Sequence, residues 1–126
     1  MSNIYPVLVD DDADARRIFQ LAMEHHQLPH QIFENAETAL KSIATEANIV
    51  VVDLFLPGID GFQFFKEMQK RQAMADVCFI ATTAYYTSQT QHDVRKRGFH
   101  GYLKKPLDVN TLVEYLVEMV ADNCND

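Results

Sequence analysis

The run of four β-branched residues at 49–52, Ile-Val-Val-Val, constrains the fold of this chain more than any other segment. A continuous β-branched run without polar alternation predicts a central strand that is covered on both faces of a parallel sheet. Apolar runs at 4–9, 31–33, 77–82 and 101–104 predict four further strands. The expected strands are therefore separated by longer segments, whose secondary structure is predicted separately.

Those longer segments carry apolar residues at helical spacing. We expect helices over 13–26, over 36–43 after Asn35 as N-cap, after the turn at Pro57-Gly58, over 87–97 up to Gly98, and after Asp108. The expected core residues of the third and last helices are Phe62, Phe65, Met68, Val109, Leu112, Val113, Leu116, Val117 and Val120. The 87–97 segment is strongly polar, with Val94 as its only aliphatic residue, so we expect this helix to be loosely held.

Five strands that alternate with five helices predict an α/β fold, namely a doubly wound parallel sheet with helices on both faces. The chain has no internal repeat, linker or low-complexity segment, so we expect residues 1–126 to form a single domain. The polar end at about 121–126 is expected to fray.

The formal net charge of −7, from 18 acidic and 11 basic residues, argues against a nucleic-acid surface, which needs a basic face. No apolar run reaches the length of a membrane span, and the N-terminus lacks the pattern of a signal peptide. Two cysteines, Cys78 and Cys124, are expected to be a buried thiol and a loose one rather than a disulfide framework. These features predict a cytoplasmic protein without a membrane or nucleic-acid partner.

Acidic side chains follow the first and third apolar runs, and a lysine follows the last. Asp10 and Asp11 end the first run, Asp53 ends the third, and Lys105 precedes Pro106. The carboxyl ends of parallel strands meet at one sheet edge, where ligands usually bind. Three neighbouring carboxylates repel one another unless a hard cation such as Mg²⁺ binds them, and a lysine there suits a phosphoryl group.

Other polar residues near these positions have simpler interpretations or weaker signals. The hydroxyl of Thr83, beside the small Ala84, is a candidate donor to a phosphoryl oxygen. Asp12 and Asp14 are interpreted as helix-capping residues. The five histidines show no convincing metal-ligand spacing, which argues against a zinc site.

Four motifs in register identify the family that this chain resembles. They are VLVDDD with the following ADARRIF, VVVDLFLPGIDG, ATTA and GYLKKP. Their order and separations are similar to those of the receiver domain of two-component response regulators, in particular the chemotaxis-regulator-like single-domain receivers. The resemblance covers essentially the whole chain, and it implies a flavodoxin-like (βα)5 sheet with strand order 2-1-3-4-5.

The resemblance also implies roles for individual residues. Asp53 corresponds to the phosphoacceptor, and Asp10 and Asp11 correspond to the acidic pair that holds Mg²⁺ together with Asp53 and the backbone carbonyl of Phe55. The remaining roles are a phosphoryl contact, a switch hydroxyl and a switch aromatic, which fall on Lys105, Thr83 and Tyr102. Positive charge around the phosphoryl oxygens is what phosphoryl transfer requires.

By this resemblance, the chain accepts a phosphoryl group from a histidine kinase or phosphotransfer protein on Asp53. It would catalyse its own phosphorylation and dephosphorylation without turnover of an external substrate. Phosphorylation would move Thr83, Tyr102 and the loosely held fourth helix, and so change how a downstream protein reads the surface of that helix, the fifth strand and the last helix. The last-helix face is also compatible with a homodimer.

Two alternatives come from other classes of protein. An aspartate-nucleophile phosphohydrolase uses a similar sheet, but it needs a second aspartate two residues after the nucleophile, where this chain has Phe55. A phosphorylation-independent adaptor would keep only the fold.

Phe55 and Tyr85 also occupy positions that border the path of the hydrolytic water in the resembled family. They predict a shielded, long-lived acyl phosphate, unless both rings simply pack on the surface.

Overall fold

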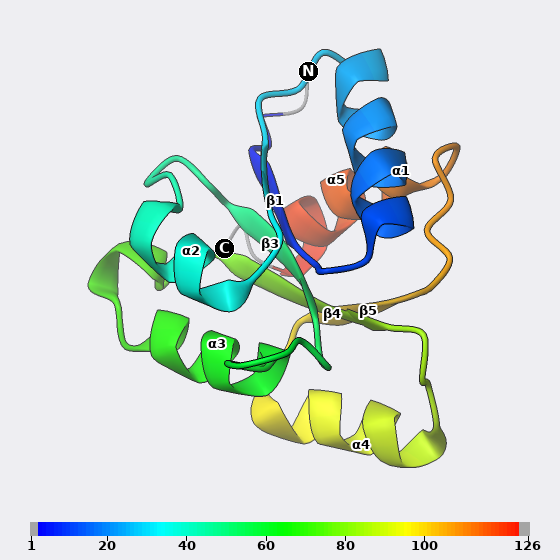
Figure 1. Cartoon of the computed structure of the whole chain (residues 1–126). Helices are drawn as coiled ribbons and strands as arrows, with labels where there is room; N and C mark the ends of the chain where they lie inside the picture. Colours follow the sequence, from blue (N-terminus) through cyan, green and yellow to red (C-terminus); the bar gives the residue numbers. More distant parts are fainter. Residues whose placement is uncertain (1–2, 124–126) are drawn as a thin grey trace.

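A five-stranded parallel sheet forms the centre of the molecule, and the computed structural model describes residues 3–123 (Figure 1). The strands are β1 (Pro6–Val9), β2 (Gln31–Phe33), β3 (Ile49–Asp53), β4 (Cys78–Thr83) and β5 (Gly101–Lys104). All pairings are parallel, in the order β2-β1-β3-β4-β5. The predicted doubly wound sheet and its strand order are therefore confirmed.

Five α-helices and one short 3₁₀ segment connect the strands. They are α1 (Ala13–His25), α2 (Ala36–Ser42), α3 (Gly61–Gln69), η1 (Gln72–Met74), α4 (Ser88–Arg97) and α5 (Leu112–Asn123). In Figure 1, α1 and α5 lie on one side of the sheet, and α2, α3 and α4 lie on the other. This arrangement follows from right-handed crossovers between parallel strands.

Each strand of the sheet centre supplies side chains to both layers of the core. Val50 and Val52 of β3 pack in the cluster with α2, α3 and α4, whereas Ile49 and Val51 pack in the cluster with α1 and α5. All four are fully buried. The continuous apolar run is thus explained by burial on both faces, as its composition predicts.

Several element boundaries differ from the prediction by one to three residues. β1 begins at Pro6 rather than at residue 4, because the N–H of Tyr5 donates to the side chain of Asn48 instead of to a strand. β4 begins and ends one residue later than predicted, and α1 ends one residue earlier than predicted. Asn35 and Thr87 cap α2 and α4, and Gly98 ends α4 with a left-handed φ of 100°.

The start of the last helix was predicted wrongly. Asp108 accepts from the N–H of Asn110 and organises a turn, and α5 begins only at Leu112. Val109 therefore lies outside the helix and is exposed. The helix continues through 121–123, where fraying was expected, and residues 124–126 of that expected tail lie outside the described residues.

Two other expectations about the core need correction. In α3, Phe64 is fully buried and Phe62 only partly, because the helix turns the face that includes Phe65 and Met68 toward the sheet. Cys78 is buried in β4, but it is disulfide-bonded rather than a free thiol, and Cys124 lies outside the described residues. Within residues 3–123, no helix is both long and apolar enough to cross a membrane.

Candidate functional site

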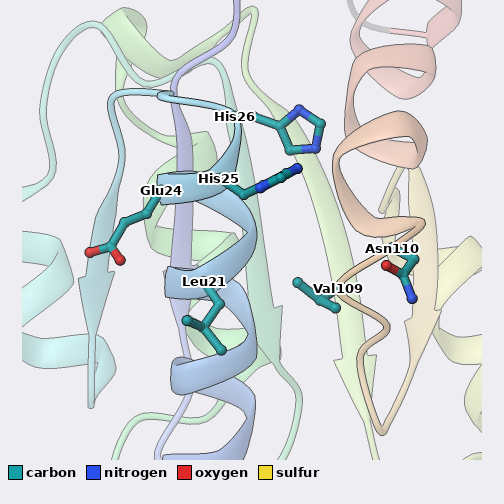
Figure 2. A pocket seen from close by; sticks show the side chains of 6 residues that line it. All are labelled: Leu21, Glu24, His25, His26, Val109 and Asn110. Carbon is teal, nitrogen blue, oxygen red and sulfur yellow. The ribbon is translucent and has the colours of Figure 1, made fainter.

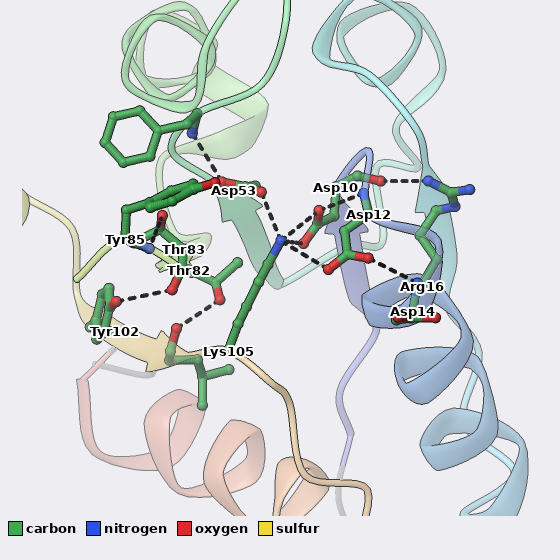
Figure 3. A network of polar contacts seen from close by, with 12 residues as sticks. Asp10, Asp12, Asp14, Arg16, Asp53, Thr82, Thr83, Tyr85, Tyr102 and Lys105 are labelled. Atoms are coloured by element: carbon green, nitrogen blue, oxygen red, sulfur yellow. Dashed lines mark hydrogen bonds and ion pairs between the residues drawn. The ribbon is translucent and has the colours of Figure 1, made fainter.

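Charged side chains from the first, third and fifth strands meet at the carboxyl edge of the sheet. Figure 3 shows Lys105 between Asp53 on one side and Asp10 and Asp12 on the other. The Lys105 Nζ lies 2.8 Å from Asp53 Oδ2, 2.9 Å from both Asp10 carboxylate oxygens and 3.6 Å from Asp12 Oδ2. One ammonium group therefore neutralises part of the charge of three carboxylates, all of which are distant in sequence from Lys105.

Burial of Asp10 makes this cluster electrostatically costly. Asp10 is fully buried, and burial raises the pKa of its carboxyl from 3.8 to about 6, with the nearby Asp53 charge adding to the effect. Hydrogen bonds from the Asp12 N–H and from Lys105 oppose this rise without cancelling it. For Lys105, burial alone would lower the pKa, but its hydrogen bonds to Asp53 and Asp10 raise it, so the lysine stays protonated.

The three predicted metal-ligating aspartates are close enough to share one cation. Asp10, Asp11 and Asp53 each offer a carboxylate oxygen, and these atoms lie within 4.8 Å of one another. Asp10 Oδ2 accepts no hydrogen bond from any described residue, although Lys105 lies near it. A buried oxygen in this state has unused capacity as a ligand. The donor set, oxygens only and negatively charged, fits a hard divalent cation.

Beside the cluster lies a cavity of about 270 Å³ that opens to solvent. It is lined by Asp11, Asp12, Asp53, Phe55, Thr83, Ala84, Tyr85 and Lys105. Asp53 is nearly buried, and its Oδ1 accepts the N–H of Phe55 at 2.9 Å. This hydrogen bond and the one from Lys105 hold the two carboxylate oxygens in a defined orientation beside the cavity.

The loop after β4 forms the opposite wall of this cavity. Thr83 is buried at the end of β4, and its hydroxyl accepts the N–H of Tyr85 at 3.0 Å. Tyr102 does not line the cavity. It lies behind Thr83, and its hydroxyl donates to the Thr83 carbonyl at 3.3 Å (Figure 3). Burial, followed by the charges of Tyr86 and Asp53, raises the pKa of Tyr102 to about 12.

Two aromatic side chains stand at the mouth of the cavity. The rings of Phe55 and Tyr85 meet edge to face, with centroids 6.2 Å apart and an interplanar angle of 74°. They are 52% and 73% exposed, respectively. The two rings thus contact each other across the opening while most of their surface faces solvent.

Sequence reasoning missed contributions from Asp12 and Arg16. Asp12 caps α1 as expected, since its side chain accepts the N–H of Asp14, but it also pairs with Lys105. Arg16 donates from Nη1 to the Asp10 carbonyl at 3.1 Å. The run of three consecutive aspartates was the available signal for Asp12, whereas nothing local marks Arg16.

A larger cavity, of about 730 Å³, lies away from this site. It is formed by the end of α1 and the segment before α5, with Leu21, Glu24, His25, His26, Val109 and Asn110 in its wall (Figure 2). The rings of His25 and His26 pack edge to face, with centroids 5.1 Å apart. None of the clustered aspartates reaches this cavity, so it does not share the chemistry of the sheet edge.

A family model described as the response regulator receiver domain matches residues 7–117. The chain belongs to this family, and its function is that of a receiver domain in two-component signalling. The family match does not favour the phosphohydrolase alternative.

Known proteins similar to this chain include two larger regulators. The DNA-binding transcriptional regulator NtrC of Escherichia coli (strain K12) is 29% identical over 115 residues, which cover 90% of this chain and 24% of NtrC. Response regulator SaeR of Staphylococcus aureus (strain USA300) is 32% identical over 111 residues, which cover 85% of this chain and 46% of SaeR. The chain therefore spans less than half the length of either relative.

A solved structure shows the same fold. The CheY-like response regulator receiver domain protein from Methanospirillum hungatei JF-1 superposes with a TM-score of 0.82 at 22% sequence identity, covering 96% of each chain.

Proposed function

We propose that Asp53 accepts a phosphoryl group from a histidine kinase or a phosphotransfer protein. The observation that carries this proposal is the position of the Asp53 carboxylate beside a cavity, 2.8 Å from the Lys105 ammonium and with an oxygen within 4.8 Å of carboxylate oxygens of Asp10 and Asp11. A carboxylate oxygen of Asp53 would attack phosphorus as the bond from phosphorus to the donor's imidazole nitrogen breaks. The ammonium of Lys105 then stays beside the transferred group.

Asp10, Asp11 and Asp53 are the residues proposed to hold Mg²⁺, with the Phe55 carbonyl as a further ligand. A bound Mg²⁺ would supply positive charge to the phosphoryl oxygens in this site. The unused Asp10 Oδ2 and the repulsion among the carboxylates support this assignment. The ion pairs of Lys105 with Asp10 and Asp53 hold two of these carboxylates side by side.

Thr83 is proposed to carry the response from the site to α4. Its hydroxyl would leave the N–H of Tyr85 and donate to a phosphoryl oxygen. The Tyr85 carbonyl accepts from the hydroxyl of Thr90 in α4 at 3.3 Å, so a shift of this loop reaches α4 directly. Only Thr90 and Val94 of this ten-residue helix are buried, which supports a mobile helix.

The proposed output is a changed protein-binding surface on α4, β5 and α5, with a homodimer through α5 as a further prediction. If binding of beryllofluoride left the amide signals of residues 87–97 unchanged, this activation scheme would be lost. We also propose a cytoplasmic location and a single domain over residues 1–126, since the sequence has no apolar run of membrane-span length and no linker-like segment.

Phosphorylation itself is tested with acetyl phosphate. We expect wild-type protein with Mg²⁺ to gain the mass of one phosphoryl group, whereas Asp53→Asn gains none. Stoichiometric labelling supports the receiver function, and sustained release of phosphate over many turnovers would instead support a phosphohydrolase. An unlabelled wild-type chain would support the phosphorylation-independent adaptor.

A further inference from the structure

At Tyr102, the outer edge of β5 is paired with one side chain of α5. β5 is the last strand of the sheet, and an edge strand normally presents unpaired N–H and C=O groups. Here the N–H of Tyr102 donates to the hydroxyl of Tyr115 at 3.1 Å, and the same hydroxyl donates to the carbonyl of Tyr102 at 3.1 Å. A hydroxyl can accept and donate at once, so Tyr115 satisfies both groups in the place of a neighbouring strand.

Gly101 makes this contact possible. A Cβ at residue 101 would lie 2.5 Å from the Tyr115 hydroxyl oxygen and 2.8 Å from Met119 Cε. Any side chain there would displace the ends of the Tyr115 and Met119 side chains and so disturb the contact between α5 and the strand edge. Burial raises the pKa of Tyr115, and its hydrogen bond with the Tyr102 backbone opposes this rise, so the hydroxyl stays protonated and able to donate.

Tyr102 is thereby held at two points. Its backbone is bound to α5 through Tyr115, and its hydroxyl is bound to the carbonyl of Thr83 in β4. Between these points, its ring packs against the ring of Tyr86, with centroids 4.2 Å apart. Because Thr83 lines the cavity beside Asp53, a short chain of contacts runs from that cavity through Tyr102 to α5.

We propose that Tyr115 is a positioning residue that fixes the backbone of Tyr102 and couples α5 to the state of Asp53. The coupling rests on the proposed function, whereas the positioning of Tyr102 rests on the hydrogen bonds alone. When the loop after β4 shifts together with Thr83, the Thr83 carbonyl that accepts from the Tyr102 hydroxyl moves as well. The displacement of Tyr102 is passed to α5 through the two hydrogen bonds of Tyr115.

The first test measures hydrogen exchange at the Tyr102 amide. In Tyr115→Phe this amide loses its acceptor, and we expect it to exchange about tenfold faster than in wild type. Tyr5→Phe is the matched control, since the Tyr5 hydroxyl makes no hydrogen bond within residues 3–123 and its own N–H carries the contact to Asn48. An unchanged exchange rate in Tyr115→Phe overturns the proposal.

The second test measures whether binding of a phosphoryl analogue changes the amide chemical shifts of α5. With beryllofluoride and Mg²⁺, we expect amide shifts in residues 112–123 of wild type, and a clear reduction of these shifts in Tyr115→Phe. Labelling of Asp53 by acetyl phosphate should be the same in both proteins. Equal α5 shifts in both proteins overturn the coupling.

A second variant disturbs the same contact by a substitution in β5 instead of α5. Gly101→Ala keeps the Tyr115 hydroxyl but places a methyl group against it, so it should reproduce both effects of Tyr115→Phe. Wild-type behaviour of Gly101→Ala in both tests counts against the proposal. Wild-type protein that neither takes acetyl phosphate nor shifts with beryllofluoride contradicts the proposed function and the coupling together, and the exchange measurement still decides the positioning.

Discussion

Replacing Asp10 with asparagine is expected to stabilise the protein at neutral pH in the absence of divalent cations. Asp10 is fully buried, and this burial raises its folded-state pKa from the ordinary value of 3.8 to about 6. A raised carboxyl pKa means that the folded state favours the protonated form, so stability falls as pH rises from the unfolded pKa through the folded one. The shift corresponds to about 3 kcal/mol lost by the wild type at neutral pH.

Asparagine removes the charge, but it does not recover all of this free energy. Its amide oxygen can still accept from the Asp12 N–H, as Asp10 Oδ1 does at 2.9 Å. Its amide nitrogen, however, takes the place of Asp10 Oδ2, which lies 2.9 Å from the Lys105 ammonium. Lys105 must therefore move toward Asp53. We expect a net gain of about 1–2 kcal/mol in the free energy of unfolding.

Urea unfolding in EDTA measures this difference directly. At about pH 8, Asp10→Asn should unfold at a higher urea concentration than wild type, and the gap should close toward about pH 4, where wild-type Asp10 is protonated. Asp108→Asn is the matched control, since Asp108 is exposed and binds only within its own turn. Added Mg²⁺ should stabilise wild type more than Asp10→Asn. A variant no more stable than wild type at about pH 8, or a gap independent of pH, would refute the reasoning.

Two further predictions concern the same edge of the sheet. Gly61→Ala should lower the free energy of unfolding by about 1–3 kcal/mol, because the new Cβ would overlap the Asp53 carbonyl and lie 2.7 Å from the Leu54 Cα; an unchanged urea midpoint would contradict this. Phe55→Asn and Tyr85→Ala should each speed loss of phosphate from phosphorylated protein several-fold, since the two rings cover the cavity mouth. Dephosphorylation no faster than in wild type would favour simple surface packing of both rings.

Much of the fold could be predicted from local patterns. The β-branched run at 49–52 predicts the central strand because burial on both faces leaves no position for a polar residue. Asn35 and Gly98 mark helix ends because their side chain or backbone satisfies groups that a helix leaves unpaired. The start of α5 was missed because the turn at Asp108 competes locally with the helix.

The burial and the contacts of the site residues could not be predicted from local sequence patterns. Asp10 and Asp11 are adjacent and identical in type, yet one is fully buried and the other exposed. Lys105 is 95 residues from Asp10 and 52 from Asp53, and no periodicity reports their contact. Tyr115 was not singled out at all, because its role depends on the bare Cα of Gly101 on another element.

The sequence by itself determined which residues form strands and helices and which carboxylates end the strands, because these depend on neighbours within a few positions. Tertiary structure alone decided that Asp10 is fully buried, that the Lys105 ammonium lies 2.8 Å from Asp53, and that Tyr115 pairs with the backbone of Tyr102 in β5. Burial and long-range hydrogen bonds are properties of packed elements. They arise only when segments distant in sequence are brought together.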